Sequence, residues 1–256
     1  MSDFPKGRFT WYDLMTSDPE KAAEFYTELV GWGTQDWEGD QPYTMWTNGD
    51  TTIGGVAQLP QEAVDAGSPP HWLAYIATPD LEATVARVSE LEGNVYVAPT
   101  EIPTVGSFAV LADPQGAVFA AFTPLGEAPG HNDPPNVGEF SWNELITTDH
   151  EAAFDFYSDL FGWVKGETMD MGDAGMYQMY TRGTFPLGGM FNKTDDMPIP
   201  PMWLFYIRVG DVNETAPRIE RLGGKITIGP MEVPGGDLIV QATDPQGAMF
   251  ALHSTK

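Results

Sequence analysis

The sequence predicts an α+β protein made of two tandem copies of one domain, each built from two βαβββ modules. Residues 7–32 recur as residues 138–163, with 13 identities in 26 aligned positions. The same offset of 131 residues relates the sequence Asp-Pro-Gln-Gly-Ala at 113–117 to its copy at 244–248. A repeat of this length is larger than a solenoid unit, so it indicates a duplicated domain. We place the first domain at 1–123, a Pro/Gly-rich linker at 124–137 and the second domain at 138–256.

Four helix starts at one spacing predict the four modules. An aspartate that can cap a helix stands before each helical pattern, because its carboxylate accepts backbone N–H groups of the first turn. A glycine follows 13 residues later as the expected helix end. The pairs are Asp18 and Gly31, Asp80 and Gly93, Asp149 and Gly162, and Asp211 and Gly224. The fourth helix contains Pro217, so it either starts late with Thr215 as its cap or is kinked.

Alternating and short apolar runs predict the strands between these helices. In the first half they are 8–15, 43–46, 51–59, 72–78, 108–111 and 117–122. The glycine pairs at 54–55 and 188–189 lack the strand–loop–helix context of a phosphate loop. They indicate a bulge or a close approach of two strands.

Composition narrows the class of protein. The chain has 256 residues, 42% of them hydrophobic, and a formal net charge of −25. Such a negative field repels phosphate backbones and anionic lipids, so we expect no nucleic-acid and no membrane partner. No apolar run is long enough to span a bilayer and the first residues carry no signal-peptide core, so we expect a cytoplasmic protein. Cysteine is absent, which excludes disulfides, thiolate zinc sites and cysteine nucleophiles.

The repeated motifs resemble those of the vicinal oxygen chelate superfamily. The run D-x-x-x-A-x-x-F-Y-x-x-[LV]-x-G-W and the ending D-P-x-G-x-x-F carry this resemblance over essentially the whole chain. The superfamily includes glyoxalase I, extradiol dioxygenases and bleomycin-binding proteins. The opening W-x-[DE]-L-x-T-x-D in two fused copies resembles the tandem glyoxalase-like proteins of actinobacteria, among them a mycobacterial antigen labelled a hydroxylase. The resemblance implies curved mixed sheets around concave clefts, and a monomer in which the two halves pair.

The same resemblance implies where a divalent metal would be bound, and this sequence departs from the pattern there. The family's ligands are His, Glu or Gln on the first strand of a module and an acid or His on the last strands. Those positions hold apolar residues here: Trp11, Leu73 and Ala120 in one half, and Trp142, Leu204 and Ala251 in the other. None of these side chains can bind a metal. We therefore expect no cofactor; a divalent metal stays conceivable, but the ligand positions do not support it.

Strand alternation predicts which side chains line the concave face. It places Phe9, Trp11 and Asp13 on that face, and Trp203 and Phe205 on the opposite face under the helices. An aromatic concavity with a few polar groups is typical of a small-molecule pocket. The predicted ligand-binding residues are Trp11, Asp13, Tyr75, Trp142, Tyr206 and Met249. The predicted catalytic residues, should there be catalysis, are Glu144, Arg208 and His253.

Three functions stay open from the sequence. The first is a metal-independent protein that binds a small apolar or aromatic molecule in one or both clefts. The second is a lyase, isomerase or hydroxylase that uses Glu144 with Arg208 or His253, with or without an unconventional metal. The third is a degenerate scaffold for protein contacts. Each polar or aromatic candidate also has a purely structural interpretation: the tryptophans as core, the acids as hydrogen-bonded strand residues, and Arg208 as a counter-ion for Glu144 or Asp13.

Overall fold

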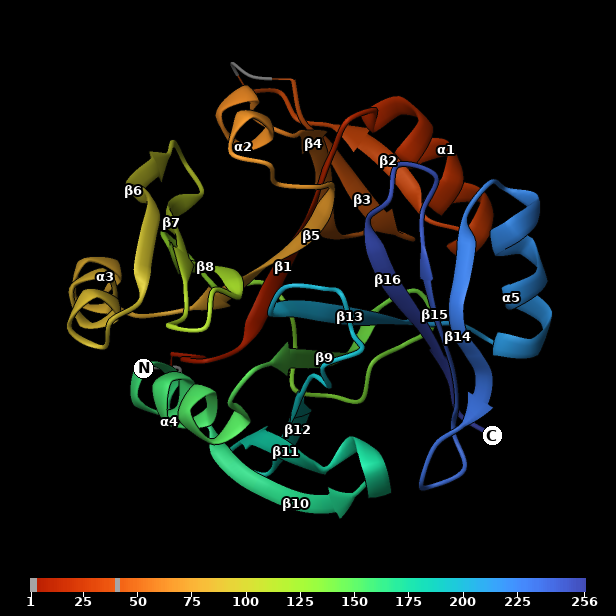
Figure 1. The fold of residues 1–256 in the computed structure, drawn as a ribbon. Coiled ribbons are helices and arrows are strands. Elements are labelled where there is room, and N and C mark those ends of the chain that lie inside the picture. The colour runs from red at the N-terminus through yellow and green to blue at the C-terminus, as the bar shows by residue number, and fades with distance from the viewer. Residues whose placement is uncertain (1–3, 40–41) are drawn as a thin grey trace. The chain divides into compact units, whose positions relative to one another are not determined.

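A computed structural model describes residues 4–39 and 42–256, which form two eight-stranded mixed sheets and five α-helices (Figure 1). The predicted α+β class is thereby confirmed. The first sheet has the order β2 (Gly33–Asp36), β3 (Thr44–Asn48), β4 (Thr51–Gln58), β1 (Phe9–Thr16), β5 (His71–Ala77), β8 (Val118–Pro124), β7 (Gly106–Ala112) and β6 (Asn94–Ile102). The second has the order β10 (Val164–Asp170), β11 (Met176–Arg182), β12 (Phe185–Asn192), β9 (Phe140–Thr147), β13 (Met202–Arg208), β16 (Met249–Ser254), β15 (Leu238–Thr243) and β14 (Lys225–Glu232).

The two sheets repeat one pairing pattern. In the first sheet, β1 runs parallel to β4 and β5 runs parallel to β8. In the second, β9 runs parallel to β12 and β13 runs parallel to β16. The outer strands of both sheets pair in antiparallel fashion. Each half of the chain therefore supplies two βαβββ modules to one sheet.

The four long helices begin where the capping signals predict. They are α1 (Pro19–Val30), α3 (Leu81–Glu90), α4 (His150–Phe161) and α5 (Val212–Arg221). The side chains of the aspartates before them each accept a backbone N–H of the first turn. The short helix α2 (Gln61–Asp65) and the 3-10 turn Gly172–Ala174 have no counterpart in the prediction. Within 4–39 and 42–256, no helix is long and apolar enough to cross a membrane.

The glycines that follow the helices have two different roles. Gly31 and Gly162 are left-handed caps, with φ of 90° and 73°, as predicted. Gly93 and Gly224 are not left-handed. A Cβ on them would lie 2.6 Å from the carbonyl oxygen of Ala112 and 2.7 Å from that of Thr243, respectively. Glycine is needed at these two positions because each lies close to a strand, and not because it ends the helix. The prediction that they cap the helices is therefore wrong.

Pro217 lies inside the fourth helix. Asp211 caps that helix, its carboxylate accepting the N–H of Asn213, and the helix continues through Pro217 to Arg221. The alternative of a late start at Thr215 is therefore wrong. A proline in the interior removes one backbone hydrogen bond but does not end the helix here.

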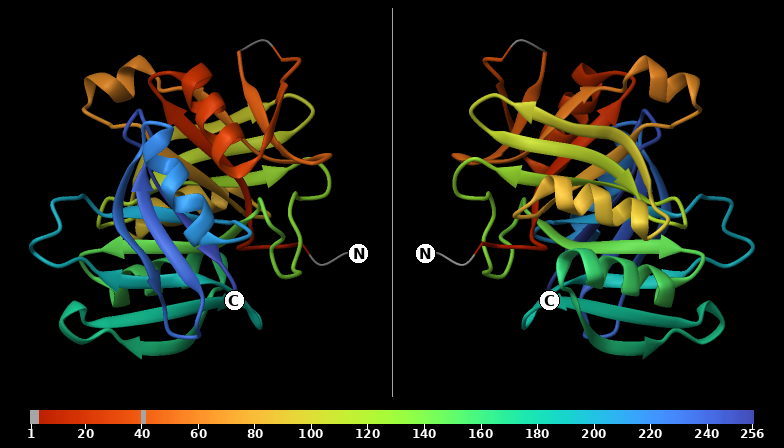
Figure 2. Two further views of the ribbon diagram at one scale, coloured as in Figure 1. Left: turned by 90° about the vertical axis from the view of Figure 1, so that its right-hand side faces the viewer. Right: turned by 90° about the vertical axis from the view of Figure 1, so that its left-hand side faces the viewer.

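The chain forms two compact units, and each combines one module from each half. Unit 1 contains residues up to Trp11, Ala74–Asn132 and Trp142–Trp203; unit 2 contains Tyr12–Leu73, Asp133–Ser141 and Leu204 onward. In unit 1, α3 lies beside α4, and Arg87 makes a bidentate ion pair with Asp159 between them (Figures 1 and 2). In unit 2, α1 lies beside α5 (Figures 1 and 2). Residues of the two halves therefore share each core.

The repeated motifs make hydrogen bonds between the halves within each unit. In unit 1 the Tyr157 hydroxyl donates to Asp113 at 3.1 Å, and the indole N–H of Trp163 donates to the carbonyl of Gly7 at 2.8 Å. In unit 2 Tyr26 donates to Asp244 at 3.4 Å, and Trp32 donates to the carbonyl of Gly138 at 2.7 Å. All four pairs are buried. The Phe-Tyr, Gly-Trp and Asp-Pro-Gln-Gly sequences thus join one copy to the other.

The first strand of each half adds aromatic packing that the alternation argument misses. Phe9 is buried, its ring stacked on Trp163 at 5.4 Å and edge-on to Trp203 at 5.7 Å. Phe9 is therefore a core residue, packed against two tryptophans of the other half of the chain. Alternation along one strand predicts relative sides, but a partner from the other half of the chain decides which side is core.

Candidate functional site

Three side chains of unit 1 form a hydrogen-bonded chain. The indole N–H of Trp142 donates to the Tyr177 hydroxyl at 2.7 Å, and that hydroxyl donates to Oε2 of Glu144 at 3.0 Å. Trp142 and Glu144 project from β9, and Tyr177 projects from β11. Glu144 is 7% exposed and Tyr177 is 6% exposed, whereas Trp142 is half-buried. The hydroxyl explains how a carboxylate is accommodated in the middle of a strand.

The glycine pair of β12 makes room for this tyrosine. Gly189 is the register partner of Glu144 on β9, and a Cβ on Gly189 would overlap the Tyr177 ring. Gly188 stands beside Asn143 in the same register, and a Cβ there would overlap the Asn143 carbonyl. The predicted close approach of strands at this glycine pair is confirmed, and its cause is one tyrosine and one carbonyl.

Unit 2 contains a related acid–tyrosine pair. The Tyr43 hydroxyl donates to Oδ1 of Asp13 at 2.6 Å, and Asp13 is 6% exposed. Gly55 is the register partner of Asp13, and a Cβ on Gly55 would overlap the Tyr43 hydroxyl. A short hydrogen bond to a carboxylate is stronger than one between neutral groups, so it offsets part of the cost of burying Asp13.

His253 lies between two polar partners in unit 2. Its Nδ1 is 3.0 Å from the Ser141 hydroxyl, and its Nε2 is 3.1 Å from Oδ2 of Asp237. The Ser141 hydroxyl also donates to the carbonyl of Tyr206 at 3.3 Å. Arg208 donates to the carbonyl of Pro135 and, at 3.0 Å, to the Thr255 hydroxyl. The imidazole is thus held in place by an acid on one side and a hydroxyl on the other.

The other predicted ligand-binding residues lie in varied surroundings. Tyr206 is 3% exposed, and its hydroxyl accepts the Gln241 amide at 2.8 Å. Tyr75 is half-buried beside Phe108, with ring centroids 5.8 Å apart. Trp11 and Met249 are half-buried on β1 and β16.

The structure groups the candidates by unit. Glu144, Trp142, Tyr75 and Trp11 belong to unit 1; Asp13, Tyr206, Arg208, Met249 and His253 belong to unit 2. The hydrogen bonds of Arg208 given above lead to linker and C-terminal residues. The ligand and catalytic roles of all these residues stay predictions.

Two tyrosines, Tyr43 and Tyr177, are part of these sites but are absent from the sequence-based list. A signal was present: each precedes the second glycine of its Gly-Gly pair by 12 residues. The pattern could have indicated a hairpin in which the tyrosine crosses the glycine, because only glycine leaves space for a ring above a neighbouring strand.

The side chains at the family's metal positions do not fit a divalent ion. Trp142, Leu204 and Ala251 offer no metal ligand, and neither do Trp11, Leu73 and Ala120. Across the part of the chain that the structure describes, no three His, Cys, Asp or Glu side chains are grouped so that they could hold a metal.

Comparison with known proteins agrees with the fold and motifs. The family model for the Glyoxalase/Bleomycin resistance protein/Dioxygenase superfamily matches residues 8–120 and 139–252. The chain is 31% identical to "Putative glyoxylase CFP32" of Mycobacterium tuberculosis, over 98% of this chain and 96% of that protein. It is 30% identical to the anthracycline biosynthesis protein DnrV of Streptomyces peucetius, over 98% of this chain and 94% of that protein.

Solved structures share the fold at low sequence identity. The 2,3-dioxygenase LapB from Pseudomonas sp. KL28 superposes with a TM-score of 0.68 at 12% identity, covering 98% of this chain and 93% of that one. The Mn(II)-bound glyoxalase from Novosphingobium aromaticivorans gives a TM-score of 0.64 at 16% identity, with coverages of 99% and 83%.

The four βαβββ modules, arranged as two tandem copies, define a tandem glyoxalase-like protein. The chain belongs to the glyoxalase/bleomycin resistance/dioxygenase superfamily.

Proposed function

We propose that this chain binds a small, largely apolar or aromatic molecule without a metal, and that Trp142 contacts it. The observation that carries the proposal is the state of the Trp142 indole. Its N–H is fixed by Tyr177, yet the ring is half-buried and, within the described residues, stacks on no aromatic ring. Trp32, Trp46, Trp72, Trp163 and Trp203, by contrast, are buried in aromatic clusters.

The Trp142–Tyr177–Glu144 chain supports recognition because it fixes the indole in one orientation. A rigid aromatic surface contributes binding energy at little entropic cost, since the ring is already immobilised before the ligand arrives. Glu144 anchors Tyr177 and is the positioning residue for Trp142 in this proposal. The pairing of Asp13 with Tyr43 supports a related site in unit 2.

The ligand class follows from the same surface and from one relative. A flat π-system stacks on an indole better than an aliphatic chain does. The similar protein DnrV is named for anthracycline biosynthesis, and anthracyclines are fused aromatic ring systems. We therefore propose a neutral, planar aromatic ligand.

Calorimetric and fluorescence titrations with naphthol and a neutral hydroxyanthraquinone test this proposal. The parent protein should bind, and Trp142→Ala should weaken binding about 10-fold or more, the loss typical of removing one stacked aromatic. Tyr177→Phe should weaken it less, because the indole stays but loses its anchor. Trp37→Phe, which alters another half-buried tryptophan, is the matched control and should bind like the parent.

Equal binding by Trp142→Ala and the parent would contradict the assignment of this surface. If neither naphthol nor the hydroxyanthraquinone bound to the parent protein, the proposed ligand chemistry would be contradicted. Far-UV circular dichroism on each variant separates lost binding from lost folding.

A second candidate function is acid–base catalysis through His253. The favouring observation is its place between Asp237 and Ser141, since an imidazole oriented by an acid can transfer protons. This candidate predicts that a turnover assay on glyoxalase-type substrates loses activity in His253→Gln while aromatic binding is retained. Elemental analysis of the purified protein would reveal any stoichiometric transition metal and so decide between this route and an unconventional metal site.

A further inference from the structure

Two arginines of unit 1 converge on one asparagine. The guanidinium of Arg8 donates to Oδ1 of Asn132 at 3.0 Å and to the carbonyl of Gly130 at 3.1 Å. The guanidinium of Arg182, the last residue of β11, donates to the same Oδ1. Two cations thus share one neutral acceptor.

The two guanidinium groups carry like charges, which repel each other. Burial, followed by the like charge of Arg182, lowers the pKa of Arg8, and Glu127 opposes that shift. The Nε atoms of both arginines are buried and have no hydrogen-bond partner. Neither guanidinium is ion-paired to a carboxylate among the described residues, although the chain has 37 acids and only 12 Lys and Arg.

The duplicated half shows that the fold does not require this pair. Glu139 occupies the place of Arg8 in the repeat, and Asn48 occupies the place of Arg182. In unit 2, Glu139 accepts the backbone N–H of Asn136, and Asn48 donates to the carbonyl of Val137 at 2.9 Å. A neutral residue and an acid therefore fill the same positions in the same scaffold.

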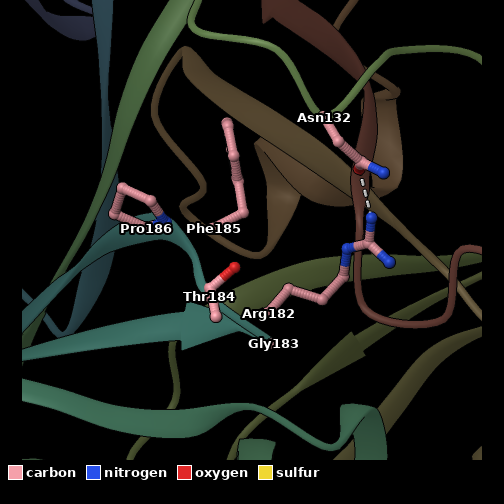
Figure 3. A pocket seen from close by; sticks show the side chains of 6 residues that line it. All are labelled: Asn132, Arg182, Gly183, Thr184, Phe185 and Pro186. Atoms are coloured by element: carbon pink, nitrogen blue, oxygen red, sulfur yellow. Dashed lines mark hydrogen bonds between the residues drawn. The ribbon is translucent and has the colours of Figure 1, made fainter.

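An open hollow lies beside Arg182. Its volume is about 420 Å³, and Figure 3 shows Arg182 reaching Asn132 at its edge. The remaining lining combines a hydroxyl with apolar surface: Gly183, Thr184, Phe185 and Pro186. One wall can therefore bind an anion, and the other can cover an apolar group.

We propose that this hollow binds an oxyanion carried on a small apolar body, a carboxylate or a phosphate monoester. The planar guanidinium of Arg182 can hold two oxygens of such a group, and Arg8, which donates to the same Asn132, adds positive potential. The Thr184 hydroxyl adds a donor, and Phe185 and Pro186 cover the apolar body. Arg182 and Tyr177 are five residues apart on β11, about 17 Å along the strand, and Trp142 does not belong to the lining of this hollow.

Isothermal titration with benzoate, phenyl phosphate and inorganic phosphate tests the proposal. The parent should bind benzoate or phenyl phosphate, whichever oxyanion the site prefers, and bind inorganic phosphate at least 10-fold more weakly. Arg182→Asn copies the residue of the other half and should lose at least 10-fold in affinity. Arg182→Lys keeps the positive charge but loses the planar set of N–H donors that can hold two oxygens, so it should bind more weakly than the parent. Arg8→Glu copies Glu139 of the other half and should likewise lose at least 10-fold in affinity.

Arg221→Asn is the matched control, because it removes an exposed cation from α5 and should bind like the parent. Three results would overturn the proposal: no heat with any of the probes, equal binding of inorganic and phenyl phosphate, or an equal loss in Arg221→Asn. Thermal unfolding of each variant checks folding. Trp142→Ala should keep this binding, so a failure of the proposed aromatic site and a failure here are distinguishable.

Discussion

The Tyr157 hydroxyl donates to Oδ2 of Asp113 at 3.1 Å, and these two buried residues come from different halves of the duplicated chain. Oδ1 of Asp113 accepts the N–H groups of Gln115 and Ala117, so the same carboxylate also forms its own turn. Tyr26 and Asp244 repeat the arrangement in unit 2. The Asp113 side chain therefore both stabilises its own turn and holds one half of the chain against the other.

The first prediction concerns this tyrosine. Tyr157→Phe removes a donor from a buried carboxylate, so the free energy of unfolding should fall by about 1–3 kcal/mol. Tyr26→Phe should cost less, because its hydroxyl is 3.4 Å from Asp244. Urea unfolding gives both values. Tyr96→Phe, at a tyrosine that is 63% exposed, should leave stability unchanged. A cost in Tyr96→Phe as large as in Tyr157→Phe would contradict the argument.

The second prediction concerns pH. Burial raises the pKa of Asp113 above its ordinary value of 3.8, against the opposing effect of its hydrogen bonds. The folded state then binds the proton more tightly than the unfolded state. The contribution of this group to stability is therefore fully present below pH 3.8 and is lost as pH rises through the folded pKa.

Asp113→Asn removes this titration, so the parent's stability advantage over the variant should shrink as pH rises from about 3.5 to about 7. Urea midpoints across that range measure the difference. Asp18 provides a control of opposite sign, because its hydrogen bonds with Lys21 lower the pKa of its carboxyl. The contribution of Asp18 is present above 3.8 and is lost as pH falls. Asp18→Asn should therefore show the opposite pH trend. The same trend in Asp113→Asn and Asp18→Asn would refute the assignment of the Asp113 shift to burial.

The third prediction concerns the glycine beneath Tyr177. Gly189→Ala should displace the Tyr177 ring and remove one donor from Glu144, at a cost of about 1–3 kcal/mol in unfolding free energy. The emission of Trp142 should shift at the same time, since its N–H loses Tyr177 as acceptor. Gly210→Ala is the control, because a Cβ there meets nothing within 4 Å. An unchanged spectrum and stability in Gly189→Ala would show that the ring is not constrained there.

The fourth prediction concerns metal addition. Because the six family ligand positions hold Trp, Leu and Ala, Mn²⁺ should raise the midpoint of thermal unfolding no more than Ca²⁺ at equal ionic strength. The comparison between ions separates a specific site from general screening of a chain with a net charge of −25. A rise specific to Mn²⁺ would overturn the metal-independent assignment.

Much of the fold could be predicted because its signals are local. Asp18, Asp80 and Asp149 cap helices at the predicted residues, since the bond from a carboxylate to a nearby N–H depends only on neighbouring sequence. Phe9 illustrates the opposite case. Its burial depends on Trp163 and Trp203, which lie more than 150 residues away along the chain.

The candidate site also combines residues that the sequence indicates with partners that only the folded structure reveals. The Trp-x-Glu sequence of Trp142 and Glu144 was visible as an unusual acid in a strand, but its partner Tyr177 was not. The partners of His253 were also hidden, since Ser141 lies 112 residues away along the chain.

The sequence by itself determined the duplication, the modules and the apolar residues at the family's metal positions, because repetition, caps and residue chemistry can be read along one dimension. Only the tertiary structure decided that Tyr157 meets Asp113, that Tyr177 meets Glu144 across Gly189, and that Arg8 and Arg182 both donate to Asn132. These contacts join strands and turns far apart in the chain. Their geometry is set by the packing of the modules and not by the spacing of the residues.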